Sequence, residues 1–444
     1  MDKQIKKTFK INSFRSPQLE IITSIQQKNN TLALLPTGYG KSICYQIPGL
    51  KNYGYTLVIS PLVALMDDQV FHLQQKGINA IAIHSNKKPN QQIFLENFKR
   101  NYYKFIYLSP EKLILSKINQ IFWSKPPALV AVDEAHCFSI WGNNFRPIYK
   151  QLPNYIFSLQ PPPTIALFTA TASKKVVSDL KTSFHIKNDQ IFIGNFFRKN
   201  LFIIHKKFFL RSQRFLYLCY LIFHKYQNKN GLIYCLTRKE VESVFNSIKQ
   251  LDFFGQLKIE FFHAGINKNQ KQKIISDFIK NKIKVLVTTN AFGMGIDKSD
   301  LEFVIHQQLP ERLENYVQEI GRAGRNGQLA FCELLIHDFD FQIQKNLNKK
   351  TKNNNQMKKF IHSKNCHHQK ILNFFGQKTD VNFNCTVCDI CSPHSEIFIQ
   401  QLRNNISSRT DTFINQQKYL FNYKKYPQFF KKYISVGTGQ SKMC

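Results

Sequence analysis

The chain has 444 residues, enough for roughly two or three domains that each bury a core. It carries 62 Lys and Arg against 28 Asp and Glu, a formal net charge of +34, so a polyanionic partner such as nucleic acid is expected. A composition rich in Lys, Asn, Ile and Phe accounts for part of this charge. No apolar run approaches the ~20 residues that span a bilayer, and residues 1–10 lack a signal-peptide core, so we expect a soluble intracellular protein without membrane contact.

Phe14, Arg15 and Gln18 stand at the start of an expected helix over residues 17–26. An aromatic ring, a guanidinium and a carboxamide suit an adenine base, because a carboxamide presents a donor and an acceptor together. Such a site would select ATP. An ordinary amphipathic helix with Gln18 in solvent explains the same residues equally well, so both interpretations stay open at this point.

An apolar run over residues 32–35 breaks at Pro36 and leads through TGYGKS into a segment that can be helical. This order is typical of a phosphate-binding loop. The glycines let backbone N–H groups surround a polyphosphate, the lysine reaches the β- and γ-phosphates, and the next hydroxyl binds Mg²⁺. Leu35 stands where the consensus has its first glycine, so the match is partial. The residues expected to bind the nucleotide are Thr37, Gly38, Gly40, Lys41 and Ser42.

The apolar strand expected over residues 129–132 runs into Asp133-Glu134-Ala135-His136. A carboxylate at the end of a buried strand, in the same sheet as a phosphate-binding loop, completes a nucleotide site. Asp133 is expected to hold Mg²⁺ with Ser42, and Glu134 to orient and deprotonate the attacking water. An acidic helix start stabilised by the helix dipole is the alternative.

A loop rich in aromatic side chains follows at residues 137–147. It holds Trp141, Phe145 and Arg146, and rings and guanidinium groups of this kind stack on nucleic-acid bases. We expect this loop to contact nucleic-acid bases and to report their presence to the nucleotide site. Packing of the rings in the core is the alternative, since the chain contains 40 phenylalanines.

Strands and helices continue to alternate in the second half, which predicts a second parallel sheet. Its strands are expected over residues 231–235, 261–262 and 284–287. The hydroxyls of Thr169 and Thr171, which follow the strand expected over residues 165–168, are expected to link the first sheet to this second domain.

Arg322 and Arg325 lie three residues apart in QEIGRAGR, which we expect to be helical, with glycines that allow close approach. An arginine here would reach a γ-phosphate bound by the other domain and stabilise the charge of the transferring phosphoryl group. Arg325 is the first choice for this arginine finger, and hydrolysis would then depend on domain closure. A basic helix face is the alternative.

Four of the ten cysteines cluster, and two C-x-x-C spacings among them suit a tetrahedral Zn²⁺ in a reducing compartment. No ligand position is left for water, so the site is expected to be structural. The expected zinc ligands are Cys366, Cys385, Cys388 and Cys391, with His367, His368 and His394 as alternatives for one position. The other cysteines are expected to be reduced and mostly buried; they are Cys44, Cys137, Cys219, Cys235, Cys332 and Cys444.

Together these motifs resemble a RecQ-family DNA helicase of superfamily 2. They occur in the order FRSPQ, LLPTGYGKS, SPLVALMDDQV, YLSPEKL, DEAHCFSIWGNNFRP and LFTATA. That family normally carries a hydrophobic residue at the position of Leu35, and the loop after DEAH separates it from DEAD-type RNA helicases. The arginine segment, Asp297 near the ATP cleft and the cysteine spacing are also similar to the family, so the resemblance covers residues 14–391.

The resemblance implies an α/β fold with two tandem RecA-like domains, each with a parallel sheet, followed by a small zinc-binding subdomain. The expected divisions are helicase domain 1 over 1–194, helicase domain 2 over 195–340, a helical hairpin with the four-cysteine zinc subdomain over 341–394, and a basic aromatic tail over 395–444. It further implies a 3′-to-5′ DNA helicase of recombination and repair that uses ATP, Mg²⁺ and Zn²⁺. Its expected partners are single-stranded and forked DNA and a single-strand binding protein. A monomer is expected, nucleoid-associated in a bacterial cytoplasm or nuclear in a eukaryote.

RecQ proteins usually continue from the zinc site into a winged-helix domain, and residues 395–444 are fewer than the ~100 that such a domain needs. These residues interleave aromatics with lysines, so they either bind single strands by charge and stacking or are the remnant of a lost domain. The alternative function is therefore a DNA-stimulated translocase or strand-annealing factor with weak unwinding. A non-catalytic DNA-binding scaffold is a third hypothesis, and the full set of nucleotide-site residues argues against it.

Overall fold

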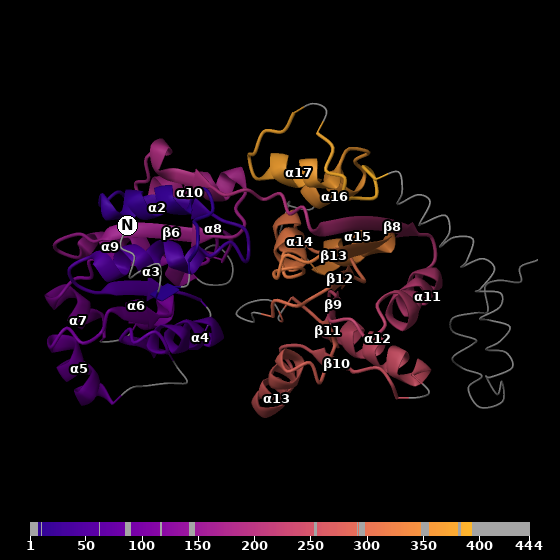
Figure 1. Cartoon of the computed structure of the whole chain (residues 1–444), viewed down its shortest axis with the longest axis horizontal. Helices are drawn as coiled ribbons and strands as arrows, with labels where there is room; N and C mark the ends of the chain where they lie inside the picture. Colours follow the sequence, from indigo (N-terminus) through magenta and orange to yellow (C-terminus); the bar gives the residue numbers. More distant parts are fainter. Residues whose placement is uncertain are drawn as a thin grey trace, which may run out of the picture.

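The computed structural model describes residues 8–9, 11–61, 63–84, 90–115, 118–141, 147–252, 255–290, 292, 298–347, 355–380 and 383–392. Two α/β lobes lie side by side, and a small helical unit sits on top of the second lobe (Figure 1). Both sheets are parallel in every pair of strands. The predicted fold class, two tandem parallel α/β domains followed by a small cysteine-bearing subdomain, is thereby confirmed.

Lobe 1 is built on a seven-stranded sheet in the described part of the chain. Its strands are β1 (Thr31–Leu34), β2 (Thr56–Ile59), β3 (Ala80–Ile83), β4 (Phe105–Leu108), β5 (Leu129–Val132), β6 (Thr164–Thr169) and β7 (Ile191–Ile193). Its helices are α2 (Gln18–Gln26), α3 (Lys41–Lys51), α4 (Val63–Gln74), α5 (Gln91–Lys99), α6 (Pro110–Leu115), α7 (Asn119–Ser124), α8 (Cys137–Trp141), α9 (Leu152–Ser158) and α10 (Lys174–Ser183). The strand order is β3-β4-β2-β5-β6-β1-β7.

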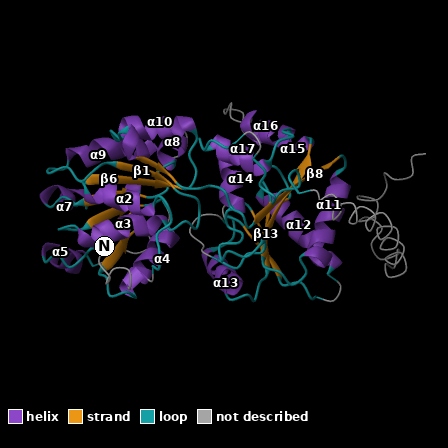
Figure 2. Cartoon of the chain, turned by 45° about the horizontal axis from the view of Figure 1, so that its top comes forward, coloured by secondary structure: helices purple, strands orange, loops and turns teal. Residues whose placement is uncertain are grey.

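Both faces of this sheet are buried, which explains why its strands are apolar throughout instead of alternating with polar residues. Helices α2, α3 and α4 cover one face, on which Ala33 and Val58 are buried. Helices α5, α7, α9 and α10 cover the opposite face, on which Leu32 and Leu57 are buried. Figure 2 shows the sheet enclosed between these helical layers.

Lobe 2 contains a six-stranded sheet of the order β10-β11-β9-β12-β13-β8. Its strands are β8 (Leu201–Phe208), β9 (Gly231–Tyr234), β10 (Ile259–Phe262), β11 (Val285–Thr288), β12 (Phe303–His306) and β13 (Ala330–His337). Its helices are α11 (Arg211–Tyr220), which a π-helical turn (Leu221–Lys225) extends, α12 (Arg238–Leu251), α13 (Lys268–Ile279), α14 (Leu313–Ile320) and α15 (Phe339–Leu347). Helices α11 and α12 pack on one face, and α13 and α14 pack on the other.

The third unit, here called the cysteine subdomain, contains α16 (Asn355–Ile361), α17 (His367–Phe374) and the loop over residues 383–392. Its apolar residues Met357, Phe360 and Ile371 belong to the same core cluster as α14 of lobe 2. Strand β8 lies at the edge of its sheet, and the loop covers this edge with two backbone hydrogen bonds. Ile203 N donates to Val387 O at 3.1 Å, and Asp389 N donates to Ile203 O at 3.1 Å. The cysteine loop therefore protects an edge that would otherwise expose unpaired backbone groups.

The predicted strands are all present, but the expected helix for the arginine segment is wrong. Helix α14 ends at Ile320, and residues 321–326 form turns, so both arginines lie beyond the helix. In the part of the chain that the structure describes, no helix combines the length and apolar character that crossing a membrane would require.

Candidate functional site

The predicted phosphate-binding loop connects β1 to α3. Gly40 adopts a φ of +87° immediately before α3, a conformation that L side chains rarely adopt. A Cβ at Gly40 would also lie 2.7 Å from Gln18 Nε2, so both backbone conformation and space require glycine there. Lys41 and Ser42 are consequently the first two residues of α3, at the positive end of the helix dipole, where phosphate groups bind favourably.

The segment around Gln18 packs directly against this loop. Gln18 is only 5% exposed, which rules out the alternative of a solvent-exposed Gln18 on an ordinary helix. Its Nε2 donates to Tyr39 O at 2.8 Å, and its Oε1 accepts from Arg15 N at 2.9 Å. Arg15 Nη1 donates to Gly38 O at 3.1 Å, and Phe14 packs beside this region as a partly buried side chain. These residues fix the shape of the loop.

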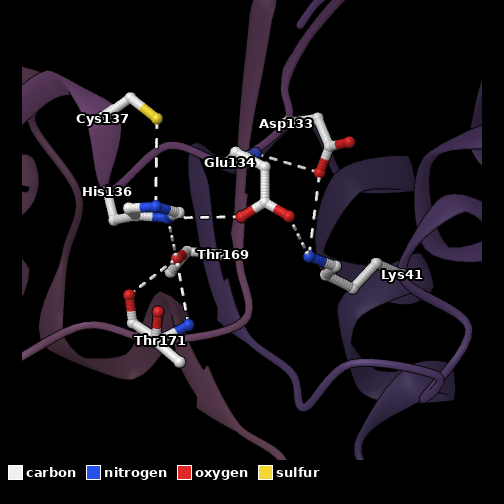
Figure 3. Close-up of polar contacts among 7 residues, drawn as sticks. All are labelled: Lys41, Asp133, Glu134, His136, Cys137, Thr169 and Thr171. Carbon is white, nitrogen blue, oxygen red and sulfur yellow. Dashed lines mark hydrogen bonds and ion pairs between the residues drawn. The ribbon is translucent and has the colours of Figure 1, made fainter. Parts of the chain in front are cut away.

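The DEAH segment brings its carboxylates to the lysine of the loop, as the sequence predicts (Figure 3). Strands β1 and β5 both pair with β6, so their carboxyl ends lie at the same edge of the sheet. Lys41 Nζ lies 3.1 Å from Glu134 Oε1 and 4.0 Å from Asp133 Oδ1. Glu134 has a φ of +48°, an unusual conformation for a residue other than glycine that is often found at functional sites.

Burial and charge act in opposite directions on the pKa values of this cluster. Burial alone would raise the pKa of Glu134, but the cations of Lys41 and His136 hold it well below its usual range. Burial raises the pKa of Asp133, and the attraction of Lys41 offsets this only in part. Although burial lowers the pKa of Lys41, Glu134 and Asp133 raise it overall. The lysine and Glu134 therefore remain an ion pair across the physiological pH range.

His136 joins the cluster in a way that the sequence analysis did not anticipate. Its Nδ1 lies 3.2 Å from Glu134 Oε2 and 2.9 Å from Thr169 Oγ1. Burial lowers the pKa of His136, but Cys137 and Glu134 raise it to about 10. The expected link from Thr169 to the second domain is wrong, because its hydroxyl is used by His136 and by the backbone of Thr171 (Figure 3). The only sequence signal for the contact between His136 and Thr169 is that the segments DEAH and TAT follow one another as motifs along the chain.

The two predicted arginines take different positions. Arg325 reaches lobe 1: a Cβ on Gly38 would lie 3.5 Å from Arg325 Cγ and 4.0 Å from its Nε. Arg322 is 5% exposed and lies close to Tyr234 inside lobe 2, where its positive charge opposes the burial that raises the pKa of this phenol. Of the two, only Arg325 is placed by these contacts beside the phosphate-binding loop. A cavity between the lobes is lined by Thr37 and Thr171 on one side and by Val317 and Gly321 on the other.

Several predicted residues lie outside the described part of the chain. These are Phe145, Arg146, Asp297 and residues 395–444, and for Trp141, at the end of α8, no side-chain position is described. The predicted DNA contacts and the predicted role of Asp297 remain predictions.

The four predicted zinc ligands converge in the cysteine subdomain. The sulfur atoms of Cys366, Cys385, Cys388 and Cys391 all lie within 4.8 Å of one another. Zn–S bonds of about 2.3 Å place the sulfurs of a tetrahedral site about 3.8 Å apart, so these thiols fit Zn²⁺. Hydrogen bonds among these thiols lower the pKa of Cys366 and raise that of Cys385, which shows how closely the four sulfur atoms are grouped. His367 instead lies 2.7 Å from Asp389, and His368 Nε2 lies 3.0 Å from Leu201 O, so neither is needed as a ligand.

The remaining described cysteines are buried thiols outside any disulfide, as expected for a reduced protein. They are Cys44, Cys137, Cys219, Cys235 and Cys332.

Three family models match successive parts of the chain. DEAD/DEAH box helicase matches residues 15–180, helicase conserved C-terminal domain matches 213–327, and RecQ zinc-binding matches 330–392. These ranges correspond to lobe 1, to lobe 2 and to the last strand of lobe 2 together with the cysteine subdomain.

Two relatives from Bacillus subtilis are named DNA helicases. The chain is 36% identical over 388 residues to ATP-dependent DNA helicase RecQ of Bacillus subtilis, covering 83% of this chain but only 63% of that protein. It is 37% identical over 341 residues to the probable ATP-dependent DNA helicase RecS of Bacillus subtilis, covering 76% of this chain and 67% of that protein. A solved structure of S. cerevisiae Dbp5 bound to RNA and ADP BeF3 superposes with a TM-score of 0.62 at 18% identity, covering 78% of this chain and 90% of that chain. This last likeness shows a shared fold.

Proposed function

The chain belongs to the RecQ family of superfamily 2 helicases, and we propose that it is an ATP-dependent DNA helicase that moves 3′-to-5′ along single-stranded DNA in recombination and repair. The main support for this proposal is that residues of both lobes lie at the same phosphate-binding loop. Lys41, Asp133 and Glu134 come from lobe 1, and Arg325 of lobe 2 lies against Gly38 of the same loop. A triphosphate between the lobes would be in contact with both.

Lys41 would bind the β- and γ-phosphates, with the backbone of Thr37, Gly38 and Gly40 around them. Ser42 and Asp133 offer the oxygen ligands that Mg²⁺ prefers, and the bound ion would neutralise phosphate charge. In the structure Lys41 is engaged with Glu134 at 3.1 Å. Phosphates that attract Lys41 would weaken this ion pair and leave Glu134 available to orient and deprotonate the attacking water. Binding of the triphosphate would thereby free Glu134 to act as the general base.

Arg325 would act as the arginine finger that stabilises negative charge on the transferring phosphoryl group. Its position beside Gly38 supports this role, whereas the burial of Arg322 against Tyr234 favours a structural role for that residue within lobe 2. Because Arg325 belongs to the second lobe, hydrolysis would depend on how the lobes are oriented.

Gln18 and Arg15 would contribute to adenine selection together with Phe14. A carboxamide has two N–H donors and an oxygen with two lone pairs, and Gln18 uses part of each on Tyr39 and Arg15. The oxygen keeps one lone pair for the base edge, and the second N–H makes only a long hydrogen bond to Gly40 O, at 3.4 Å, which a contact to the base could replace. Gln18 would then both hydrogen-bond to the adenine and stabilise the phosphate-binding loop.

The chain contains 62 Lys and Arg but only 28 Asp and Glu, and this excess of positive charge supports DNA as the proposed partner. The loop with Trp141, Phe145 and Arg146 is the proposed contact to bases, through stacking and charge. Zn²⁺ held by the four cysteines would stabilise the cysteine subdomain and, through Ile203, the edge of lobe 2.

The proposal is tested by ATP hydrolysis with no nucleic acid, with single-stranded DNA and with single-stranded RNA, together with unwinding of a forked DNA duplex. We expect DNA to stimulate hydrolysis, and Lys41→Ala to abolish it with an unchanged thermal midpoint of unfolding. Lys51→Ala, at the C-terminal end of the same helix, is the matched control at an exposed position and should retain activity. Hydrolysis that DNA does not stimulate would refute the proposal. Stimulated hydrolysis without fork unwinding would instead support a translocase.

A further inference from the structure

The segment that joins the two lobes is short and carries an unusual set of contacts. Strand β7 belongs to the sheet of lobe 1 and ends at Ile193, and β8 of lobe 2 begins at Leu201. This interlobe linker, residues 194–200, begins beside the phosphate-binding loop, because Gly194 N donates to Leu34 O at 2.8 Å. Two side chains near its other end reach the turn that carries the arginines.

Both side chains bind the same carbonyl. Arg198 Nη2 donates to Gly324 O at 2.8 Å and to Ala323 O at 3.2 Å. Asn200 Nδ2 also donates to Gly324 O at 2.8 Å, and to Gln328 O at 2.7 Å. The carbonyl of Gly324 belongs to the peptide unit that leads into Arg325. Its orientation therefore determines the direction in which the Arg325 side chain leaves the backbone.

The turn is shaped to receive these donors. Gly324 has a φ of +59°, and a Cβ there would collide with Asn200 Nδ2 and lie 2.8 Å from Gln328 O. Its own N–H donates to Leu301 O at 2.8 Å. The peptide is thus held on one side by lobe 2 and on the other by the linker, and only glycine fits between them.

Repulsion between positive charges disfavours the position of Arg198. Burial lowers the pKa of Arg198, and the nearby guanidinium groups of Arg325 and Arg15 lower it further. Arg15 donates to Gly38 O, and Arg325 lies against Gly38 as well. Arg198 lines the cavity between the lobes together with Thr37 of the phosphate-binding loop, so three arginines from three segments of the chain lie near this loop. Backbone carbonyls of the turn hold Arg198 in this position.

We propose that Arg198 and Asn200 are positioning residues, which hold the Gly324 carbonyl and thereby direct Arg325 into the nucleotide site. This inference rests on the proposed function, in which Arg325 is the arginine finger. Both donors lie in the interlobe linker, so the placement of the Arg325 side chain depends on the conformation of this seven-residue segment.

A double-mutant cycle with Arg325 tests this role. Arg198→Met removes the guanidinium but keeps an unbranched side chain, and we expect kcat for DNA-stimulated ATP hydrolysis to fall about 10- to 100-fold, because small misplacements of catalytic groups have effects of this size. The KM for ATP should change less than about threefold. In an Arg325→Ala background the same substitution should cause almost no further loss, since Arg198 acts through Arg325.

The control is Lys199→Met, which removes the same charge from an exposed neighbour and should leave kcat unchanged. Arg198→Lys should restore part of the activity, because an ammonium group can still donate to the carbonyl. If Arg198→Met does not fold, as judged by its thermal midpoint, Asn200→Ala removes the other donor and takes its place in the cycle.

The outcomes separate this inference from the proposed function. If the wild-type chain shows no DNA-stimulated hydrolysis, the proposed function is refuted. If it does, but the losses from Arg198→Met and Arg325→Ala multiply in the double variant, Arg198 acts independently and the inference is overturned. A raised KM with an unchanged kcat would also overturn it, because that result assigns Arg198 to nucleotide binding.

Discussion

Glu134→Gln tests the central electrostatic feature of the site. The substitution keeps the size of the side chain but removes the charge that lies 3.1 Å from Lys41 Nζ and 3.2 Å from His136 Nδ1. Loss of a general base reduces kcat by about 10²- to 10⁴-fold, or about 3–5 kcal/mol of activation free energy. We therefore expect hydrolysis to fall by this factor while nucleotide binding persists, because Lys41 and the loop backbone remain.

The cost in stability follows from the same contacts. Removing one partner of a buried ion pair costs about 3–5 kcal/mol when the other charge is left alone. Here Asp133 Oδ1 remains 4.0 Å from Lys41, and the glutamine oxygen can still accept a hydrogen bond. We therefore expect a loss of only about 1–2 kcal/mol in the free energy of unfolding of lobe 1. For a domain of this size that corresponds to a decrease of about 2–8 °C in thermal midpoint.

The assay combines steady-state hydrolysis in the presence of single-stranded DNA, equilibrium binding of a fluorescent ATP analogue and thermal unfolding. Glu96→Gln makes the same chemical change at an exposed position on α5 and should behave as wild type. Hydrolysis by Glu134→Gln within threefold of wild type would refute the assignment of Glu134 as base. Loss of binding together with hydrolysis would show that the charge serves nucleotide binding instead.

Two further predictions concern the metal and the pH dependence of stability. A mercurial reagent should release one equivalent of zinc per chain from the wild type, and Cys388→Ser should bind less than one equivalent. Cys219→Ser changes a buried thiol outside the cluster and should bind the full equivalent. A full equivalent of zinc in Cys388→Ser would contradict the assignment. His136 has a folded-state pKa raised to about 10, so its stabilising contribution is complete below its unfolded value of about 6.5 and is lost as the pH rises toward 10. The thermal midpoint of wild type should therefore exceed that of His136→Asn most at pH 6, with a difference that shrinks toward pH 10, and a constant difference would disprove this coupling.

The sequence by itself was enough to predict a nucleotide site and a zinc site, because each prediction depends on residue types at short, fixed spacings. In a phosphate-binding loop the glycine comes directly before the lysine at the start of the helix, as Gly40 and Lys41 do. The acidic residues of such a site follow a buried strand, as Asp133 and Glu134 do. The paired C-x-x-C spacings likewise bring Cys385, Cys388 and Cys391 close together along the chain. The alternation of apolar segments with helices was sufficient to predict two parallel sheets.

The tertiary structure decided those contacts between distant segments that no motif specifies. A glycine with positive φ and two side chains from the linker hold residues 321–326 in turns, so the expected helix ends before Arg322. Gln18 is buried because the phosphate-binding loop packs on it. Thr169 turns toward His136 because β5 and β6 are neighbours in the sheet. Local sequence patterns record propensity and chemistry, whereas these contacts arise only when the strands take their order and the two lobes meet.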